Sequence, residues 1–246
     1  MNITRRRFIE TSTGGLIAGV LAGPSSLLAA PEKIFSPKLG LVTYNWGKDW
    51  DVPTVIKNCE ATGFGGVELR STHKHGVEIT LGKKERQEVR KQFEDSKVEL
   101  VGLGSACEYH SADPAVLKKN IDETNAFVRL CKDVGGSGIK VRPNGLPKDV
   151  PVEKTIEQIG KSLRKVATYA ADYDVQIRVE VHGRGTAELP LIQQMMDIAD
   201  HPNAVICWNC NPTDLNGEGL KHNFELVKKH FGETVHIHDL RNDMYP

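Results

Sequence analysis

The stretch GIKVRPNGLPKDVPVEKTIEQIGKSLRKVATYAADYDVQIRVEV (residues 138–181) decides the fold class. It begins and ends with short apolar, β-branched runs, Gly138 to Arg142 and Gln176 to Val181, which are typical of buried strands. Between them, a segment that starts near Pro151 repeats apolar residues at helical spacing, namely Ile156, Ile159, Leu163, Val166 and Ala170. A strand, a helix and a second strand in this order predict a parallel βαβ unit.

The same alternation continues on both sides of this unit. Seven strands are predicted, at Leu39 to Thr43, Gly66 to Arg70, Glu99 to Leu103, Gly138 to Arg142, Gln176 to Val181, Ala204 to Trp208 and Thr234 to His238. Helices are predicted from Val52 to Cys59, from Asp113 and Pro114 toward Val134, from Pro151, from Leu189 to Ala199 and from Leu220 to Phe231. Repeated strand-helix units in a chain of 246 residues predict an α/β fold of the (β/α)8 TIM-barrel type, which takes about 250 residues. Because a closed barrel of this type has eight strands, we expect the eighth strand-helix unit to be missing before Pro246.

The first 30 residues predict a signal peptide rather than part of the fold. Thr4-Arg5-Arg6-Arg7-Phe8-Ile9 precedes a weakly apolar, glycine-containing run from Gly14 to Ala30. A charged start, a short apolar middle and small residues at the end are typical of a targeting segment, and the arginines indicate twin-arginine export. We therefore expect a signal peptide at residues 1–30 and an incomplete barrel at residues 31–246, with the mature protein in the periplasm and not in the membrane.

Charge and composition narrow the class of partner. The chain carries 32 Lys and Arg against 32 Asp and Glu, so no broad basic field is available to hold a nucleic-acid backbone. A hydrophobic content of 39% is ordinary for a packed enzyme-sized domain. We expect a small-molecule partner and no nucleic acid, and a homo-oligomer is compatible with this composition.

The cysteines do not indicate a disulfide framework. There are five, an odd number spread over a long chain, and most are expected to be core thiols. Cys207-Trp208-Asn209-Cys210 has the spacing of a redox dithiol. It follows five strand-helix units instead of lying in an early one, so we interpret the pair as incidental or structural.

Polar side chains gather at the predicted strand ends, where barrels of this type build their active sites. Three pairs lie two residues apart on a strand and so share one face: Lys140 and Arg142, Glu180 and His182, and His236 and His238. Further polar residues follow other strands, namely Glu68, Glu108 and His110. Because an isolated charge inside a barrel is costly, their convergence on a metal ion or an anionic substrate is the simplest interpretation.

Four motifs resemble successive signatures of the xylose-isomerase-like TIM barrel superfamily, which contains the sugar-phosphate isomerases and epimerases. They are GFGGVEL at 63–69, VEVHG at 179–183, VICWN at 205–209 and VHIHD at 235–239. The resemblance implies a divalent metal, Mn²⁺, Mg²⁺, Co²⁺ or Zn²⁺, held by Glu180, Asn209 and His236. Asn209 stands where the superfamily has an aspartate, and the superfamily's fourth ligand, a glutamate that ends strand eight, has no counterpart before Pro246.

The resemblance further implies an isomerase or epimerase that moves a proton through an enediolate. Such transfer needs two positioned acid/base groups, and the second strand-end glutamate of the superfamily is absent. Glu180 is the predicted base. His182, His238, Lys140 and His110 all remain open as its partner, and His182 and Lys140 are assigned with Glu180 to catalysis. The predicted substrate-binding residues are Glu68, Glu108, His110, Arg142 and His238.

Other interpretations of the mouth of the barrel stay open. Arg142 and Lys140 are candidates to clamp a phosphate or carboxylate, and an ion pair of Arg142 with Glu108 or Glu180 is the alternative. Proton abstraction beside a carbonyl can also end in elimination, which gives a lyase or hydrolase of oxidised glycosides on the same barrel. The neutral Asn209 favours a third interpretation, an exported carbohydrate-binding barrel without catalysis.

Overall fold

The computed structural model of the chain describes residues 37–237. These residues belong almost entirely to a compact unit that begins at Lys38. The predicted signal peptide at residues 1–30 and the predicted site residue His238 lie outside the described residues.

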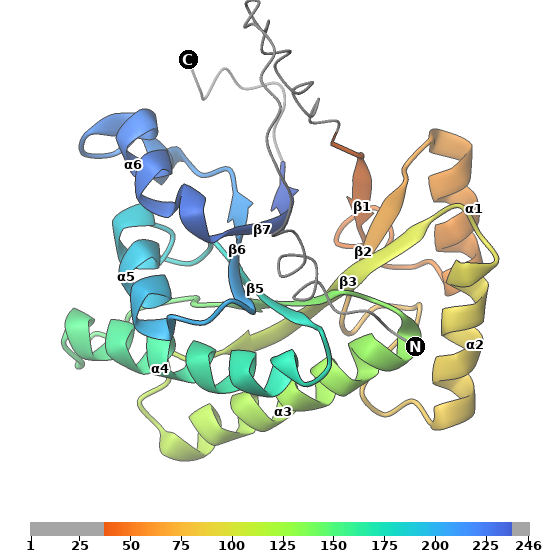
Figure 1. Ribbon diagram of the computed structural model, residues 1–246, viewed down its shortest axis with the longest axis horizontal. Coiled ribbons are helices and arrows are strands. Elements are labelled where there is room, and N and C mark those ends of the chain that lie inside the picture. Colours follow the sequence, from red (N-terminus) through yellow and green to blue (C-terminus); the bar gives the residue numbers. More distant parts are fainter. Residues whose placement is uncertain (1–36, 238–246) are drawn as a thin grey trace, which may run out of the picture. The chain divides into compact units, whose positions relative to one another are not determined.

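Within residues 37–237, seven parallel strands form one sheet in which each strand pairs with the next in sequence order. They are β1 (Gly40–Val42), β2 (Gly66–Arg70), β3 (Glu99–Glu108), β4 (Gly138–Arg142), β5 (Gln176–Glu180), β6 (Ala204–Asn209) and β7 (Phe231–His236). The sheet curls, and β1 and β7 form its two ends (Figure 1). The predicted α/β barrel of parallel strands is confirmed.

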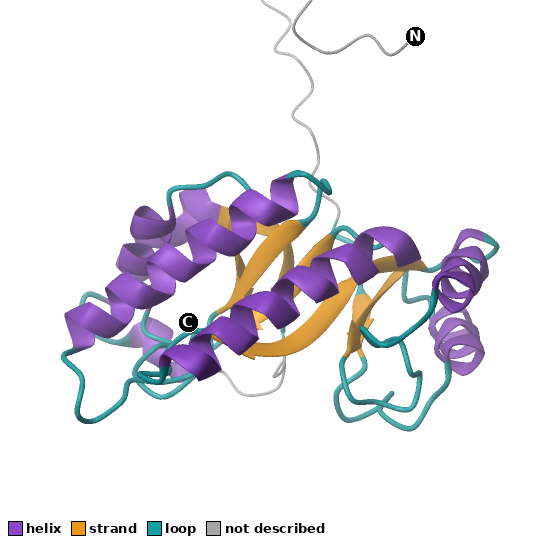
Figure 2. Cartoon of the chain, turned by 90° about the horizontal axis from the view of Figure 1, so that it is seen from below, coloured by secondary structure: helices purple, strands orange, loops and turns teal. Residues whose placement is uncertain are grey.

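Helices cover the outer face of the curled sheet (Figure 1). They are α1 (Val52–Thr62), α2 (Lys83–Glu94), α3 (Pro114–Val134), α4 (Val152–Ala171), α5 (Leu189–Ala199) and α6 (Gly219–Val227), with short 3₁₀ turns η2 (Pro212–Leu215) and η3 (Lys228–His230). The two longest, α3 and α4, run across the strands in the view from below (Figure 2). Within residues 37–237, no helix is both long and apolar enough to cross a bilayer.

Local sequence sets the ends of these helices. At the start of α3 the Asp113 carboxylate accepts a hydrogen bond of 2.8 Å from the backbone N–H of Ala115, and Pro114 occupies the first turn, where its missing N–H is harmless. The helix ends at Gly135, whose φ of 90° lies in the left-handed region that glycine adopts without strain. The chain then turns directly into β4, which carries part of the site.

An apolar core fills the space between sheet and helices, whereas the inside of the barrel is polar. Arg178 of β5 is 1% exposed and donates hydrogen bonds to the Val101 carbonyl at 2.9 Å and to the Ser137 hydroxyl at 2.8 Å. Glycines make room for its guanidinium, because a Cβ at Gly138 would lie 2.3 Å from Nε of Arg178. Arg178 therefore forms a floor inside the barrel, on the same strand face as Glu180, two residues further on.

The helix and strand boundaries depart most from the sequence-based expectation at α2, at the end of β3, which runs to Glu108 instead of Leu103, and at the start of β7. Helix α2 was not predicted, since its sequence is strongly polar and buries only Val89 and Phe93. The helix predicted to run from Leu220 to Phe231 ends at Val227, and Phe231 starts β7. Packing causes this last change, because the Phe231 ring stacks on Trp208 of β6 with centroids 6.1 Å apart.

Candidate active site

Four charged side chains from four strands meet inside the barrel. We call Glu68 (β2), Lys140 (β4), Glu180 (β5) and His236 (β7) the central quartet. Nζ of Lys140 lies 3.2 Å from Oε1 of Glu68 and 3.3 Å from Oε2 of Glu180. On the other side, His236 places Nε2 at 3.2 Å from Oε2 of Glu68 and Nδ1 at 3.2 Å from Oε1 of Glu180. Each carboxylate thus contacts both cationic side chains.

The absence of a side chain at Gly104 of β3 makes room for the quartet. Gly104 of β3 pairs in register with Lys140 and with Arg70. A Cβ at Gly104 would lie 2.7 Å from Oε1 of Glu68 and 3.4 Å from Cε of Lys140. Glycine at this position therefore allows the Glu68 carboxylate and the Lys140 side chain to come together.

Burial and mutual attraction set the ionisation of the quartet. Burial acts to raise the pKa of Glu68, but the charges of Lys140 and His236 outweigh it and lower that pKa to about 2. The pKa of Glu180 likewise falls to about 2, because hydrogen bonding to His236 and the charge of Lys140 outweigh burial. Burial acts to lower the pKa of His236, yet hydrogen bonds with Cys207, Glu180 and Glu68 raise it to about 12. Two carboxylates, an ammonium and an imidazolium leave the quartet without net charge.

The side chains of the quartet do not match the ligands that the divalent metal implied by the sequence resemblance requires. A metal ligand must be deprotonated, whereas both nitrogens of His236 face carboxylate oxygens and so both act as donors. Lys140 already occupies the oxygens of Glu180 and Glu68 that a metal would need. Within residues 37–237, no three His, Cys, Asp or Glu side chains are grouped so that they could hold a metal ion. The described arrangement does not fit a divalent metal, and the assignment of Glu180, Asn209 and His236 as ligands stays a prediction.

A second group of polar side chains lies at the carboxyl ends of β3, β4 and β5, and we call Glu108, Arg142, Asn144 and His182 the rim cluster. Oε1 of Glu108 receives hydrogen bonds from the Arg142 guanidinium at 3.1 Å and from the Asn144 amide. Oδ1 of Asn144 lies 2.9 Å from Nδ1 of His182. The ion pair of Arg142 with Glu108, which the sequence left as the alternative to a phosphate clamp, is therefore the observed arrangement.

The remaining predicted residues fall in different places. His110 lies beside the rim cluster, with Nδ1 at 3.7 Å from Oε2 of Glu108. Asn209 is buried and pairs in register with His236. Cys207 and Cys210 are both buried free thiols, and Sγ of Cys210 lies 3.5 Å from the His236 carbonyl oxygen. The sequence missed Asn144, although its position two residues beyond β4 is the signal that could have found it.

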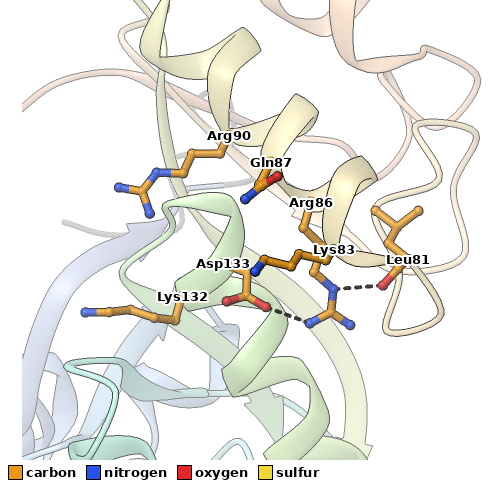
Figure 3. A pocket seen from close by; sticks show the side chains of 7 residues that line it. All are labelled: Leu81, Lys83, Arg86, Gln87, Arg90, Lys132 and Asp133. Carbon is orange, nitrogen blue, oxygen red and sulfur yellow. Dashed lines mark hydrogen bonds and ion pairs between the residues drawn. The ribbon is translucent and has the colours of Figure 1, made fainter.

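A separate hollow of about 720 Å³ lies on the outer surface at α2 and the end of α3 (Figure 3). Its lining is Leu81, Lys83, Arg86, Gln87, Arg90, Lys132 and Asp133, and includes none of the predicted site residues. Arg86 is held there by Asp133 at 2.9 Å and by the Leu81 carbonyl at 2.8 Å (Figure 3). The Arg86 guanidinium is thus engaged by groups of the protein itself, and its ion pair with Asp133 joins α2 to α3.

Comparison with known proteins agrees with the fold. Residues 56–244 match the family described as xylose isomerase-like TIM barrel, and the chain belongs to that family. No curated protein sequence matches the chain.

Three solved structures illustrate the shared fold. The 3-keto-D-glucoside 4-epimerase YcjR from E. coli, in its apo form, is 14% identical with a TM-score of 0.68, and the match covers 83% of this chain and 80% of that one. The IolI protein with a bound zinc atom is 15% identical with a TM-score of 0.66, covering 80% and 70%. An L-ribulose 3-epimerase is 15% identical with a TM-score of 0.65, covering 80% and 68%. Identities this low show a common fold and leave the chemistry to be argued from the site.

Proposed function

We propose that this protein is an epimerase or isomerase of a sugar or sugar derivative, which moves a proton at a carbon beside a carbonyl group. The observation that carries the proposal is the central quartet: two buried glutamates from different strands, Glu68 and Glu180, held between one ammonium and one imidazole. The sequence supplied a single predicted base, and the geometry offers Glu68 as the second acid/base group. The epimerases among the solved structures of similar fold support this reading.

Two ionised carboxylates suit the first step of such a reaction. Glu180 takes the proton from the carbon beside the carbonyl, and the electron pair of the broken C–H bond moves onto the carbonyl oxygen to form an enediolate. Oε1 of Glu68 is buried inside the barrel, 3.2 Å from the Lys140 ammonium, which keeps this carboxylate ionised and ready to accept a proton.

The second step returns a proton to carbon. His236 contacts both carboxylates, so it can give its Nε2 proton to Glu68, which delivers that proton to the other face of the enediolate or to its neighbouring carbon. Glu180 then releases the proton that it removed to water, Nε2 of His236 takes up a proton from water, and the quartet regains its starting state. Delivery to the other face is epimerisation, and delivery to the neighbouring carbon is isomerisation.

The rim cluster serves in this proposal as the place where sugar hydroxyls bind. Carboxylate, guanidinium, amide and imidazole groups lie within hydrogen-bonding distance of one another in Glu108, Arg142, Asn144 and His182. Such groups offer both donors and acceptors, which a polyhydroxylated substrate requires. Arg142 acts here with Glu108 and is not a free clamp for phosphate.

The test is exchange of the substrate's carbon-bound hydrogen with solvent. The purified chain is incubated in D₂O with ketoses, aldoses and 3-keto-glucosides, and deuterium incorporation and product configuration are read by NMR. Glu180→Gln should lower the exchange rate by about 10²–10⁴-fold, the usual contribution of a positioned acid/base group. Glu157→Gln, on the exposed outer face of α4, is the matched control and should leave the rate unchanged.

The products also distinguish the competing chemistries. Isomerisation conserves the mass of the substrate, whereas a lyase or hydrolase of oxidised glycosides releases an aglycone. The probable 3-DHS dehydratase AsbF from Bacillus anthracis has a similar fold with a TM-score of 0.58, and elimination is therefore included in the assay. Absence of deuterium incorporation from every sugar, or equal rates for wild type and Glu180→Gln, would reject the proposal and favour a carbohydrate-binding barrel.

Export belongs to the same proposal. It is supported by the arginine-containing start at residues 4–9 and the apolar run that follows. Replacement of Arg5, Arg6 and Arg7 by lysine should move the protein from the periplasmic to the cytoplasmic fraction in a bacterial host. Unchanged fractionation would remove the export part of the proposal and leave the enzymatic part standing.

A further inference from the structure

We propose that the centre of this barrel works without a bound metal, because the ammonium group of Lys140 supplies the positive charge that a divalent cation would give to the enediolate oxygen. The inference rests on the proposed proton transfer and goes beyond it by naming the electrophile. It departs from the metal site that the family resemblance implies.

The position of Lys140 carries the inference. Its side chain is 6% exposed, and Nζ lies between the two carboxylates of the quartet, 3.2 Å from Glu68 and 3.3 Å from Glu180. The strand beneath it is fixed, since the Ser105 hydroxyl donates a 2.7 Å hydrogen bond to the Lys140 carbonyl. Moving this buried ammonium would take one of two cationic partners from each buried carboxylate, which is costly, so it stays in the centre.

A second buried cation, Arg178, lies on the strand next to Lys140. Arg178 pairs in register with Lys140 on the neighbouring strand, and its guanidinium lies inside the barrel. Its nearest acidic partner, Glu233, is 3.3 Å away and largely exposed. A divalent ion among the quartet would face Lys140 directly, and at low effective dielectric the repulsion between these charges is large.

The chemistry balances without a metal. When Glu180 takes the proton from carbon, the electron pair of that C–H bond becomes negative charge on the former carbonyl oxygen. Lys140 donates a hydrogen bond to that oxygen from its ammonium group and keeps its proton. When carbon is protonated again, the electron pair returns to carbon and the carbonyl is restored, so no oxidant, reductant or further reactant is required.

The first experiment measures metal binding itself. The whole purified chain is stripped with EDTA and titrated calorimetrically with MnCl₂ and with ZnCl₂, and the metal content of the untreated protein is measured by mass spectrometry. The expected result is no stoichiometric site, and a rate of solvent exchange on the active sugar that EDTA does not change.

The second experiment removes the ammonium. Lys140→Met leaves Glu68, Glu180, His236 and Asn209 without the competing cation and should bind Mn²⁺ or Zn²⁺ roughly tenfold or more tightly than wild type. The added substitution Glu180→Gln should abolish the gain. Lys161→Met, which removes an exposed lysine on α4, is the matched control and should bind metal as wild type does. Circular dichroism verifies that each variant is folded, and if Lys140→Met does not fold, the wild-type titration alone decides.

One result overturns the inference: stoichiometric binding of Mn²⁺ or Zn²⁺ to the wild-type chain that Glu180→Gln removes. This result would leave the proposed epimerase or isomerase function in place as a metal-dependent one. Conversely, a chain that binds no metal and exchanges no sugar hydrogen rejects the proposed function and leaves no reaction for Lys140 to serve, so the two failures are distinguishable.

Discussion

The central quartet and the ion pairs on the outer helices use the same side chains to opposite effect. On the outside, lysine and glutamate meet one helical turn apart, as in Lys161 and Glu157, where both side chains are more than half exposed. Inside, Lys140 and its two glutamates are withdrawn from water. Exposed pairs contribute little because water and salt screen them, whereas a buried group depends on its partners for its charge. Inside this barrel, burial together with pairing therefore sets the charge of Lys140 and its two glutamates.

The largest effect on stability is expected from removal of the buried cation. Lys140→Met takes one partner from each of two buried carboxylates, and the free energy of unfolding should fall by about 3–5 kcal/mol. Urea titration followed by circular dichroism measures the change. A loss no larger than that of a surface lysine would show that the quartet is open to water.

Adding a methyl group beside the quartet should lower stability by a smaller amount. Gly104→Ala places a Cβ 2.7 Å from Oε1 of Glu68, so the carboxylate must shift while its contacts resist. Overpacking of this kind costs about 1–3 kcal/mol, and the rate of solvent exchange should fall with it. The same urea titration and the NMR exchange assay check both effects, and unchanged values in both would contradict the tight packing inferred here.

The free energy of unfolding should depend on pH, because Glu68, Glu180 and His236 have shifted pKa values. The pKa values of Glu68 and Glu180 fall from the ordinary 4.5 to about 2, so their stabilisation is full above pH 4.5 and is lost as the pH falls toward 2. The pKa of His236 rises from 6.5 to about 12, so its stabilisation is full below pH 6.5 and is lost as the pH rises toward 12. These three groups together should stabilise the fold most between pH 4.5 and 6.5.

High salt distinguishes the contribution of the quartet to stability from that of the exposed ion pairs. Urea titrations across the pH range in EDTA and about 1 M NaCl screen the exposed pairs, because the Debye length falls to about 3 Å. The dependence on pH that survives belongs to the buried groups. A stability profile that flattens completely in salt would assign the effect to the surface instead.

The smallest effect is expected at the surface. Lys161→Met removes the exposed partner of Glu157 and should leave the urea midpoint within the error of the wild-type value. A clear loss of stability would show that the outer pairs form a supporting network, and the contrast with Lys140 would then weaken.

Sequence patterns predicted most of the fold because the barrel repeats one local unit. Strands β2 and β4 begin and end where their apolar runs do. Helix α2 was missed because ten of its twelve residues are not buried, so its helical periodicity is faint. Its helical state comes from packing Val89 and Phe93 against the rest of the fold, which is tertiary information.

The four residues of the central quartet could be named from the sequence as polar strand-end residues, but their pairing could not. Glu180 and His236 could be named because strand ends gather at one mouth of a barrel. The second glutamate of the quartet could not be assigned, since Glu68 and His236 are 168 residues apart and only the curl of the sheet brings them together. The ion pair between Arg142 and Glu108 depends likewise on the register of neighbouring strands.

The contact between His236 and Glu68 also sets the stage of synthesis at which the central quartet is complete. The ribosome makes β2 early and β7 late, and the imidazole that joins Glu68 to Glu180 arrives only with β7. Contacts between distant parts of a chain form slowly, because the intervening segment must first be ordered. Under the proposed mechanism, a nascent chain that lacks β7 carries Glu68, Glu180 and Lys140 but not the imidazole that protonates Glu68, and it completes no proton transfer until β7 is in place.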